Sequence, residues 1–163
     1  MGRALAALGA IVVVSAPARA RAEDRKLVFG EGGVGELELR ERTFHAGVNA
    51  FVEWEAVPEW LELELGASLL AIDGGVELPV ELQLKKPFRI TPGVELMLGV
   101  GPEVLQISAP QGQSTVYGVT WALDLMFWPW RHAGFWIEPS NDVYFRDRAT
   151  LGVGSTGGVL FGF

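Results

Sequence analysis

Apolar and polar residues alternate along most of the chain after residue 26. In residues 43–56, "TFHAGVNAFVEWEA", even positions carry Phe44, Val48 and Trp54, whereas most odd positions are polar or small. Successive side chains of a strand point to opposite faces, whereas a helix would scatter both sets around its circumference. The pattern therefore predicts a strand with one apolar face and one polar face.

Eight segments of the chain show this alternation. They are residues 27–40, 43–56, 60–71, 76–86, 88–101, 115–128, 133–145 and 150–163. An even number of strands lets an antiparallel barrel close with both chain ends on one side. The sequence thus predicts an all-β fold, an eight-stranded antiparallel up-and-down barrel. Pro92 and Pro139 fall inside predicted strands, and we expect each at a bulge or a strand end, because proline lacks the N–H that the ladder needs.

The predicted connections differ little in length. On the side of the C-terminus they are "VPE", "KP" and "WPWRHA", and on the other side "ERT", "DGG", "GPEVLQISAPQGQ" and "RDRA". Of these seven, only the thirteen residues 101–113 exceed a short turn. Long adhesive or receptor loops are therefore not expected.

The composition of the polar face indicates which solvent the apolar face meets. A soluble barrel would cover its outer face with long charged side chains of both signs. Here the polar face is rich in Gly, Ser and Glu, as suits a narrow, crowded lumen. Aromatic residues flank the three turns on the C-terminal side: Trp54, Trp60, Phe88, Phe127, Trp128 and Trp130. Such a belt is typical of a membrane interface, so a transmembrane β-barrel is predicted, with a soluble exported barrel that binds an apolar ligand as an alternative.

The first 22 residues have the order of a signal peptide. Arg3 precedes the apolar stretch "ALAALGAIVVV", and Ala18, Ala20 and Ala22 offer cleavage sites. We therefore expect a signal peptide at 1–22 and an exported barrel domain at 23–163. Cleavage after Ala22 would lower Lys+Arg from 13 to 10 and leave 20 Asp+Glu, a formal charge of −10, which excludes nucleic acid as a partner. The chain has no cysteine, so disulfides do not stabilise it.

The polar face is strongly acidic. Ten residues are predicted to line the lumen: Glu53, Glu55, Glu62, Glu64, Glu77, Glu81, Arg89, Glu95, Asp124 and Glu138. An eight-stranded barrel is only wide enough for its side chains to fill, so these residues predict a polar plug in which cations such as Lys85 bridge several carboxylates. The surplus charge leaves open a cation-selective conduit or a divalent-cation site, although no loop has EF-hand spacing. No catalytic residue, metal ligand or cofactor is assigned.

These features together resemble a known class of proteins. The export signal, eight alternating strands, the stretch "LMFWPWRHAGFWIEPS" and the final "VLFGF" are similar to small bacterial outer-membrane barrels of the OmpA/OmpX type, including uncharacterised outer-membrane β-barrel proteins of Gram-negative bacteria. The resemblance implies an outer-membrane location, contact with outer-membrane lipid, and Val159, Phe161 and Phe163 as the signal read by the barrel-assembly machinery. It carries no ligand-binding residue across and leaves the oligomeric state open.

An enzymatic role is not expected. Some small outer-membrane barrels that remodel lipid A use a His-X-Ser pair, but His45 and His132 are each followed by "AG". The sequence therefore predicts a structural or envelope-integrity protein, with a small cation-permeable channel as the alternative.

Overall fold

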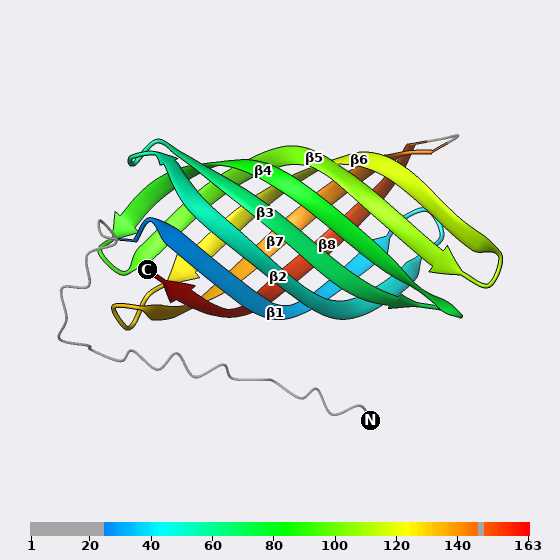
Figure 1. Cartoon of the computed structure of the whole chain (residues 1–163), viewed down its shortest axis with the longest axis horizontal. Coiled ribbons are helices and arrows are strands. Elements are labelled where there is room, and N and C mark those ends of the chain that lie inside the picture. The colour runs from blue at the N-terminus through cyan, green and yellow to red at the C-terminus, as the bar shows by residue number, and fades with distance from the viewer. Residues whose placement is uncertain (1–24, 147–148) are drawn as a thin grey trace, which may run out of the picture.

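Eight antiparallel strands form one closed barrel. The computed structural model describes residues 25–146 and 149–163, so the predicted signal peptide lies outside the described residues. The strands are β1 (Leu27–Glu38), β2 (Thr43–Val57), β3 (Leu61–Ile72), β4 (Gly75–Thr91), β5 (Val94–Ala109), β6 (Gly112–Phe127), β7 (Ala133–Phe145) and β8 (Ala149–Gly162). Each strand pairs with its sequence neighbours, and β1 pairs with β8 to close the barrel (Figure 1). The predicted fold class is confirmed.

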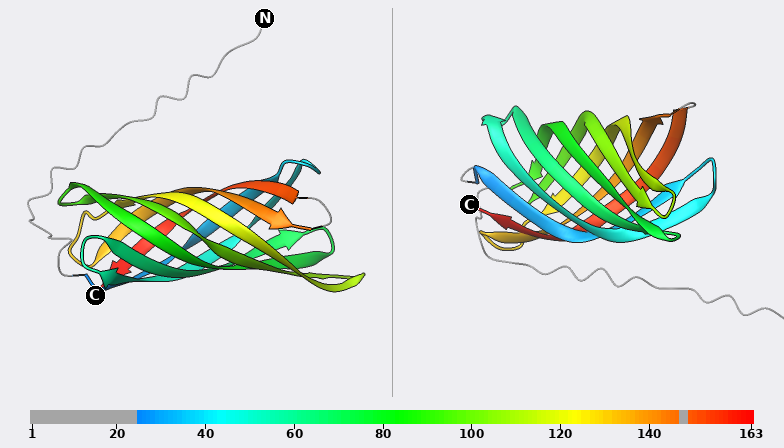
Figure 2. Two further views of the ribbon diagram at one scale, coloured as in Figure 1. Left: turned by 90° about the horizontal axis from the view of Figure 1, so that it is seen from above. Right: turned by 45° about the vertical axis from the view of Figure 1, so that its right-hand side comes forward.

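The two ends of the barrel are named here by the turns they carry. The C-terminal rim holds the β2–β3, β4–β5 and β6–β7 turns together with Phe163, whose amide donates to the carbonyl of Leu27 at 2.9 Å. The hairpin rim, at the opposite end, holds the β1–β2, β3–β4 and β5–β6 turns together with the end of β7 and the start of β8. There the β5–β6 hairpin extends beyond β7, since β6 pairs with β7 only from Tyr117 onward (Figure 2). No helix in the described ranges is long and apolar enough to cross a membrane.

The strand alternation places large apolar side chains on the outside. Exposed residues on the outer wall include Val48, Leu65, Leu69, Leu78, Leu82, Leu84, Leu98, Val100, Leu123, Leu125, Ile137 and Val153. Glu31 and Ser155 are polar exceptions on this wall. The polar positions between the apolar ones face the lumen. This arrangement is the reverse of a soluble barrel, which would turn its apolar face inward.

The strand boundaries in the middle of the chain differ from those predicted. The expected turn "KP" at residues 86–87 lies inside β4, and the true β4–β5 turn is Pro92–Gly93. The expected strand 88–101 is therefore divided between β4 and β5. The expected long connection 101–113 is mostly strand, with its turn at residues 110–111. Pro87 is tolerated in β4 because the pairing of β4 with β3 already ends at Lys85, so no donor is needed on that side.

Prolines inside the strands coincide with local losses of pairing. Pairing between β3 and β4 is absent across Pro79, between β4 and β5 across Pro102, and between β6 and β7 across Pro139. A proline has no N–H to donate to the neighbouring strand, which accounts for each interruption. Pro92 follows the last residue of β4, which agrees with the expected strand end. The expectation for Pro139 is wrong, because this residue lies inside β7, beside one of these interruptions and not at a bulge.

Inward glycines make room for inward aromatic rings. Gly30 of β1 lies directly opposite Phe51 of β2, and a Cβ at Gly30 would overlap the ring of Phe51. Gly118 of β6 likewise lies opposite Tyr144 of β7, whose ring covers it. In a barrel this narrow, a glycine on one neighbouring strand provides space for each of these two rings.

We expect Gly30→Ala to destabilise the barrel by about 1–3 kcal/mol, because the new methyl group would displace the Phe51 ring. Urea unfolding in detergent micelles measures the change. Gly33→Ala, three residues along the same strand, is the control, since its Cβ would meet nothing nearer than the Gly47 carbonyl oxygen at 3.9 Å. An equal loss of stability in both variants would contradict this packing argument.

Candidate functional site in the barrel lumen

The ten residues predicted to line the lumen occupy three levels of it. Glu55, Glu62, Arg89 and Glu95 line a cavity at the C-terminal rim, which Glu53 also borders. Glu53, Glu64, Asp124 and Glu138 are buried near the middle, Glu81 lies beside them, and Glu77 lines a cavity at the hairpin rim. The side chains thus share one interior but not one site.

Lys85 is the centre of the buried polar layer. Its side chain is fully buried, and its ammonium group donates to Glu64 at 2.6 Å, to Glu138 at 3.0 Å and to Asp124. We call Lys85 and its neighbours Glu53, Glu64, Asp124 and Glu138 the lysine layer. Because its three bonded partners come from β3, β6 and β7, one cation from β4 joins four of the eight strands.

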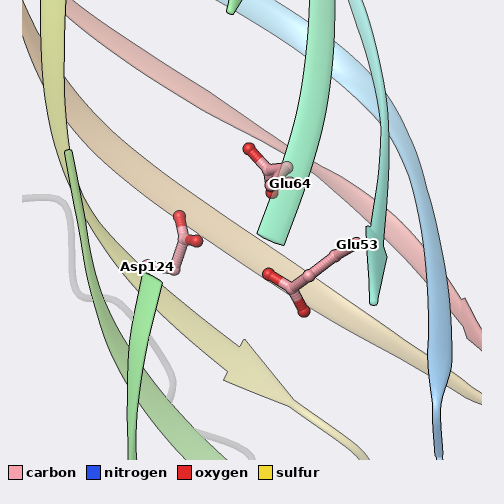
Figure 3. A group of neighbouring side chains, drawn as sticks. All are labelled: Glu53, Glu64 and Asp124. Atoms are coloured by element: carbon pink, nitrogen blue, oxygen red, sulfur yellow. The ribbon is translucent and has the colours of Figure 1, made fainter. Parts of the chain in front are cut away.

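Three carboxylates of the lysine layer converge. Oxygens of Glu53, Glu64 and Asp124 lie within 4.8 Å of one another, and the side chains point toward a common space (Figure 3). Such a group of oxygens has the chemistry of a metal site. Here, however, the Lys85 ammonium already bonds two of the three carboxylates, so this triad has its cation within the chain.

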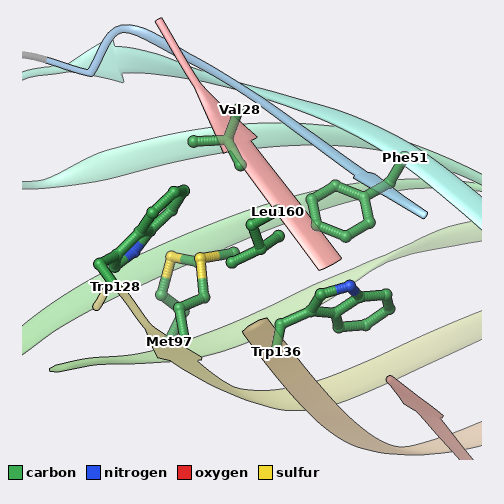
Figure 4. Close-up of a cluster of buried hydrophobic side chains, with 7 residues drawn as sticks. Val28, Phe51, Met97, Trp128, Trp136 and Leu160 are labelled. Carbon is green, nitrogen blue, oxygen red and sulfur yellow. The ribbon is translucent and has the colours of Figure 1, made fainter. Parts of the chain in front are cut away.

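An apolar cluster fills the lumen beside the lysine layer. We call it the aromatic plug, and its members are Val28, Phe51, Met97, Met126, Trp128, Trp136 and Leu160 (Figure 4). The rings of Phe51 and Trp136 meet edge to face at 4.9 Å, an arrangement that adds to the burial energy. Lys85 lies 5.6 Å from the centre of the Phe51 ring, so the plug and the lysine layer are in contact.

Trp128 differs from its prediction. It was expected in the interfacial belt, but only 3% of it is exposed and its ring lies inside the plug. The Arg25 guanidinium covers the ring at 3.7 Å, and Arg25 also lies 4.0 Å from Glu95. Trp60, Phe88, Phe127 and Trp130 do lie exposed near the C-terminal rim. This stack of Arg25 on Trp128 lies at the C-terminal end of the lumen, where Arg25 also lines a cavity.

The described residues enclose further cavities in the lumen, three of which bear on its function. The C-terminal vestibule, about 440 Å³, is lined by Arg25, Arg89 and several glutamates. The far vestibule at the hairpin rim, about 720 Å³, contains the His45–Glu77 pair at 3.1 Å. Between them lies the acidic chamber, about 30 Å³, lined by Glu36, Glu81, Glu103, Glu138 and Asp142. Within the described residues, the lysine layer and the aromatic plug divide the two vestibules.

Several lumen residues were missed in the sequence. Four of them are the apolar residues Phe51, Met97, Met126 and Trp136, which occupy positions that the strand alternation assigns to the polar face. Their odd or even position in the strand was the one signal that could have placed them in the lumen. Glu103 was missed because residues 101–113 were taken as a connection. The alternation of Glu95, Gly99 and Glu103 along β5 would have shown that the strand continues.

Lys85→Met should destabilise the barrel by about 3–5 kcal/mol, because it leaves several buried carboxylates without their cation. Urea unfolding in micelles measures the loss. The control is Lys86→Met at the next position, where the ammonium donates to the Glu59 carbonyl and lies near the rings of Trp60 and Phe88 at the surface. A loss below about 1 kcal/mol is expected for this variant. Similar losses in both variants would show that the lysine layer is not a stabilising centre.

The fold matches solved membrane barrels. The chain is similar to the N-terminal β-barrel domain of Pseudomonas aeruginosa OprF, with 16% identity, a TM-score of 0.64, and coverage of 85% of this chain and 98% of that one. It is also similar to Neisserial surface protein A (7% identity, TM-score 0.67, 84% and 96% covered) and to Pseudomonas aeruginosa OprG (10%, 0.64, 88% and 98%). No protein-family model matches the chain, and no curated protein sequence matches it. The chain has the fold of the small eight-stranded outer-membrane β-barrels.

Proposed function

We propose that this chain is an integral protein of the outer membrane of Gram-negative bacteria, with a structural or envelope-integrity role. The observation that carries the proposal is the mainly apolar outer wall of a closed barrel. Such a wall suits lipid hydrocarbon. Because hydrocarbon offers no hydrogen-bond partners, closure of the barrel is needed to pair the backbone N–H and C=O groups of every strand. The soluble ligand-binding alternative requires the opposite arrangement of side chains.

The filled lumen supports a structural role. The aromatic plug and the lysine layer occupy the cross-section between the vestibules. A solute path would require both to move, at the expense of buried apolar contacts and of buried ion pairs. The side chains inside the barrel therefore stabilise its wall and do not form a path for solutes.

The first test is gel mobility of the membrane-extracted protein in SDS, unheated and boiled. A closed barrel whose backbone bonds all lie within the wall should resist SDS until heated, so the two samples should migrate differently. Sucrose-gradient fractions should place the same protein with the outer membrane. Identical migration, together with recovery in the periplasmic fraction, would contradict the proposal.

A catalytic role is not part of the proposal. In the described residues, the polar contact of His45 is to Glu77, and that of His132 is to the carbonyl oxygen of Gly162 at 2.9 Å. Neither histidine activates a serine in this arrangement, which a serine nucleophile would need.

We also propose that Val159, Phe161 and Phe163 form the segment read by the barrel-assembly machinery. Phe161 and Phe163 lie on the outer wall at the C-terminal rim, where a partner has access to them. Phe161→Ala with Phe163→Ala should lower the heat-modifiable fraction in the outer membrane several-fold. Phe44→Ala, an exposed phenylalanine near the other rim, is the control. Equal assembly of both variants would refute this assignment.

A cation-permeable channel is the second candidate, favoured by the acidic vestibules. If the lumen is closed, the folded protein should give no conductance steps in planar bilayers. If steps occur, Glu62→Gln with Glu64→Gln should lower cation selectivity, because these glutamates lie along the lumen. Cation-selective steps that respond to these substitutions would replace the structural role by a channel.

A further inference from the structure

Two charged side chains interrupt the outer wall, and they have opposite signs. Among the outward positions of the eight described strands, charge occurs at Glu31 of β1 and at Lys86 of β4. Counted from the C-terminal rim, Glu31 lies four residues into β1 and Lys86 five residues into β4. All strands of a barrel tilt alike, so the two charges lie at a similar depth in a membrane, on different sides of the barrel.

Glu31 has no partner within the described part of the chain. Its side chain is exposed on the outer wall, and its cross-strand neighbours are Ala50 of β2 and Val159 of β8. No described residue gives it a hydrogen bond or an ion pair. An unpaired carboxylate against lipid is unfavourable, and charged residues at membrane depth commonly pair with one another. A cation from another molecule would offset this cost.

Lys86 has donors left for such a pair. Its ammonium group donates to the Glu59 carbonyl oxygen at 3.0 Å and lies 5.6 Å and 5.8 Å from the centres of the Trp60 and Phe88 rings. No described carboxylate forms an ion pair with it. An ammonium group carries three donors, so one hydrogen bond leaves two of them. Lys86 can therefore bind an external carboxylate and keep its present contacts.

The wall around Glu31 is hollow. Gly33 and Gly157 have no side chain there, Ala50 and Ala67 have short ones, and together with Glu31 they line a groove of about 770 Å³. We call these five residues the hollow face. Its small residues let another molecule approach the backbone of the wall closely.

The wall around Lys86 is raised instead. Lys86 shares it with Leu82 and Leu84 of β4 and with Leu98 and Val100 of β5, which are between 43% and 50% exposed. Leu98 lies directly opposite Lys86 across the two strands. We call these five residues the leucine face. On both faces the wall continues from the charge toward the hairpin rim with uncharged residues, so a raised surface and a hollow one lie at the same depth.

We propose that the hollow face binds the leucine face of a second copy of this chain, with Glu31 of one copy paired to Lys86 of the other. Two copies with the same orientation in a membrane present these faces at one depth, so leucine side chains enter the groove as the charges meet. An ion pair is stronger in the low dielectric of lipid hydrocarbon than in water. Packing of the raised surface into the groove adds dispersion contacts.

The two faces differ, so the contact is heterologous. Each pair of copies leaves one hollow face and one leucine face free, and a third copy can add in the same way. The proposal therefore predicts oligomers larger than dimers. It rests on the membrane location proposed above, because water would solvate both charges and remove the need to pair them.

Energy transfer between labelled copies in vesicles tests the proposal. The chain has no cysteine, so Gln111→Cys in the exposed β5–β6 turn gives one site for a donor or an acceptor dye. Donor and acceptor copies are folded together into phosphatidylcholine vesicles, whose headgroups carry no primary amine to pair with Glu31. We expect transfer that persists when lipid dilutes the protein, and more than two bleaching steps per complex.

Gel mobility before and after heating verifies that the protein in each sample is folded. Transfer at the level of random mixing, from protein that shows the heat-dependent shift, would overturn the proposal. The membrane location would then stand, whereas loss of the shift itself would contradict the proposed function.

Charge reversal gives the sharpest variants. Glu31→Lys alone or Lys86→Glu alone sets like charges against each other, and each should lower the transfer at least about threefold. An equal mixture of these two variants, one carrying the donor and the other the acceptor, should restore it, because each acid again meets a base. Glu41→Lys, an exposed position in the β1–β2 turn outside both faces, is the control and should leave the transfer unchanged. A mixture that does not restore transfer would refute the pairing of Glu31 with Lys86.

A neutral variant covers the case in which a reversed charge prevents folding. Gly33→Leu fills the hollow face, and its Cβ would meet nothing nearer than the Gly47 carbonyl oxygen at 3.9 Å, so the barrel itself has room for it. Transfer should again fall at least about threefold, because the leucine face no longer fits the groove. Unchanged transfer in the folded variant would also overturn the proposal.

Discussion

Closure of β1 onto β8 is the constraint on which the rest of this structure depends. Hydrocarbon offers no partner to a backbone N–H or C=O, so a strand wall in lipid must have no open edge. The pairing runs without interruption from Val28 opposite Gly162 to Glu38 opposite Gly152. At its centre Gly32 faces Gly158 and Gly33 faces Gly157. A Cβ on Gly32 would strike the backbone of Gly157, so this seam closes tightly because it lacks side chains.

The narrow interior follows from closing a barrel with eight strands. Its side chains must fill it, and the chain does so in two ways. The aromatic plug takes the space that the seam glycines leave, with Phe51 over Gly30. The polar part is held by Lys85, which is paired on several sides. Burying one cation among several carboxylates costs desolvation energy, and the short ion pairs offset that cost.

The sequence predicted the architecture well because strand alternation is a local property. In residues 43–56 and 60–71 the odd or even position of each residue decides whether it lies on the outer wall or in the lumen. Strand boundaries in the middle of the chain were harder to predict, because Pro87 and Pro102 look like strand ends. Both in fact lie inside strands, at positions where pairing with one neighbouring strand is absent. Contacts within the lumen could not be predicted from the sequence. The ion pairs of Lys85 with Glu64, Asp124 and Glu138 depend on the stagger between strands, which no single segment encodes.

The most direct test of an apolar outer wall around a filled lumen is fluorescence quenching by lipids with brominated acyl chains. It uses single-tryptophan variants folded into vesicles. One variant keeps Trp121, which is 42% exposed on the outer wall of β6, and the other keeps Trp136, which is 5% exposed in the aromatic plug. If the apolar wall faces lipid around a filled lumen, quenching should be strong for Trp121 and weak for Trp136. Equal quenching, or stronger quenching of Trp136, would contradict an apolar wall that faces lipid around a filled lumen.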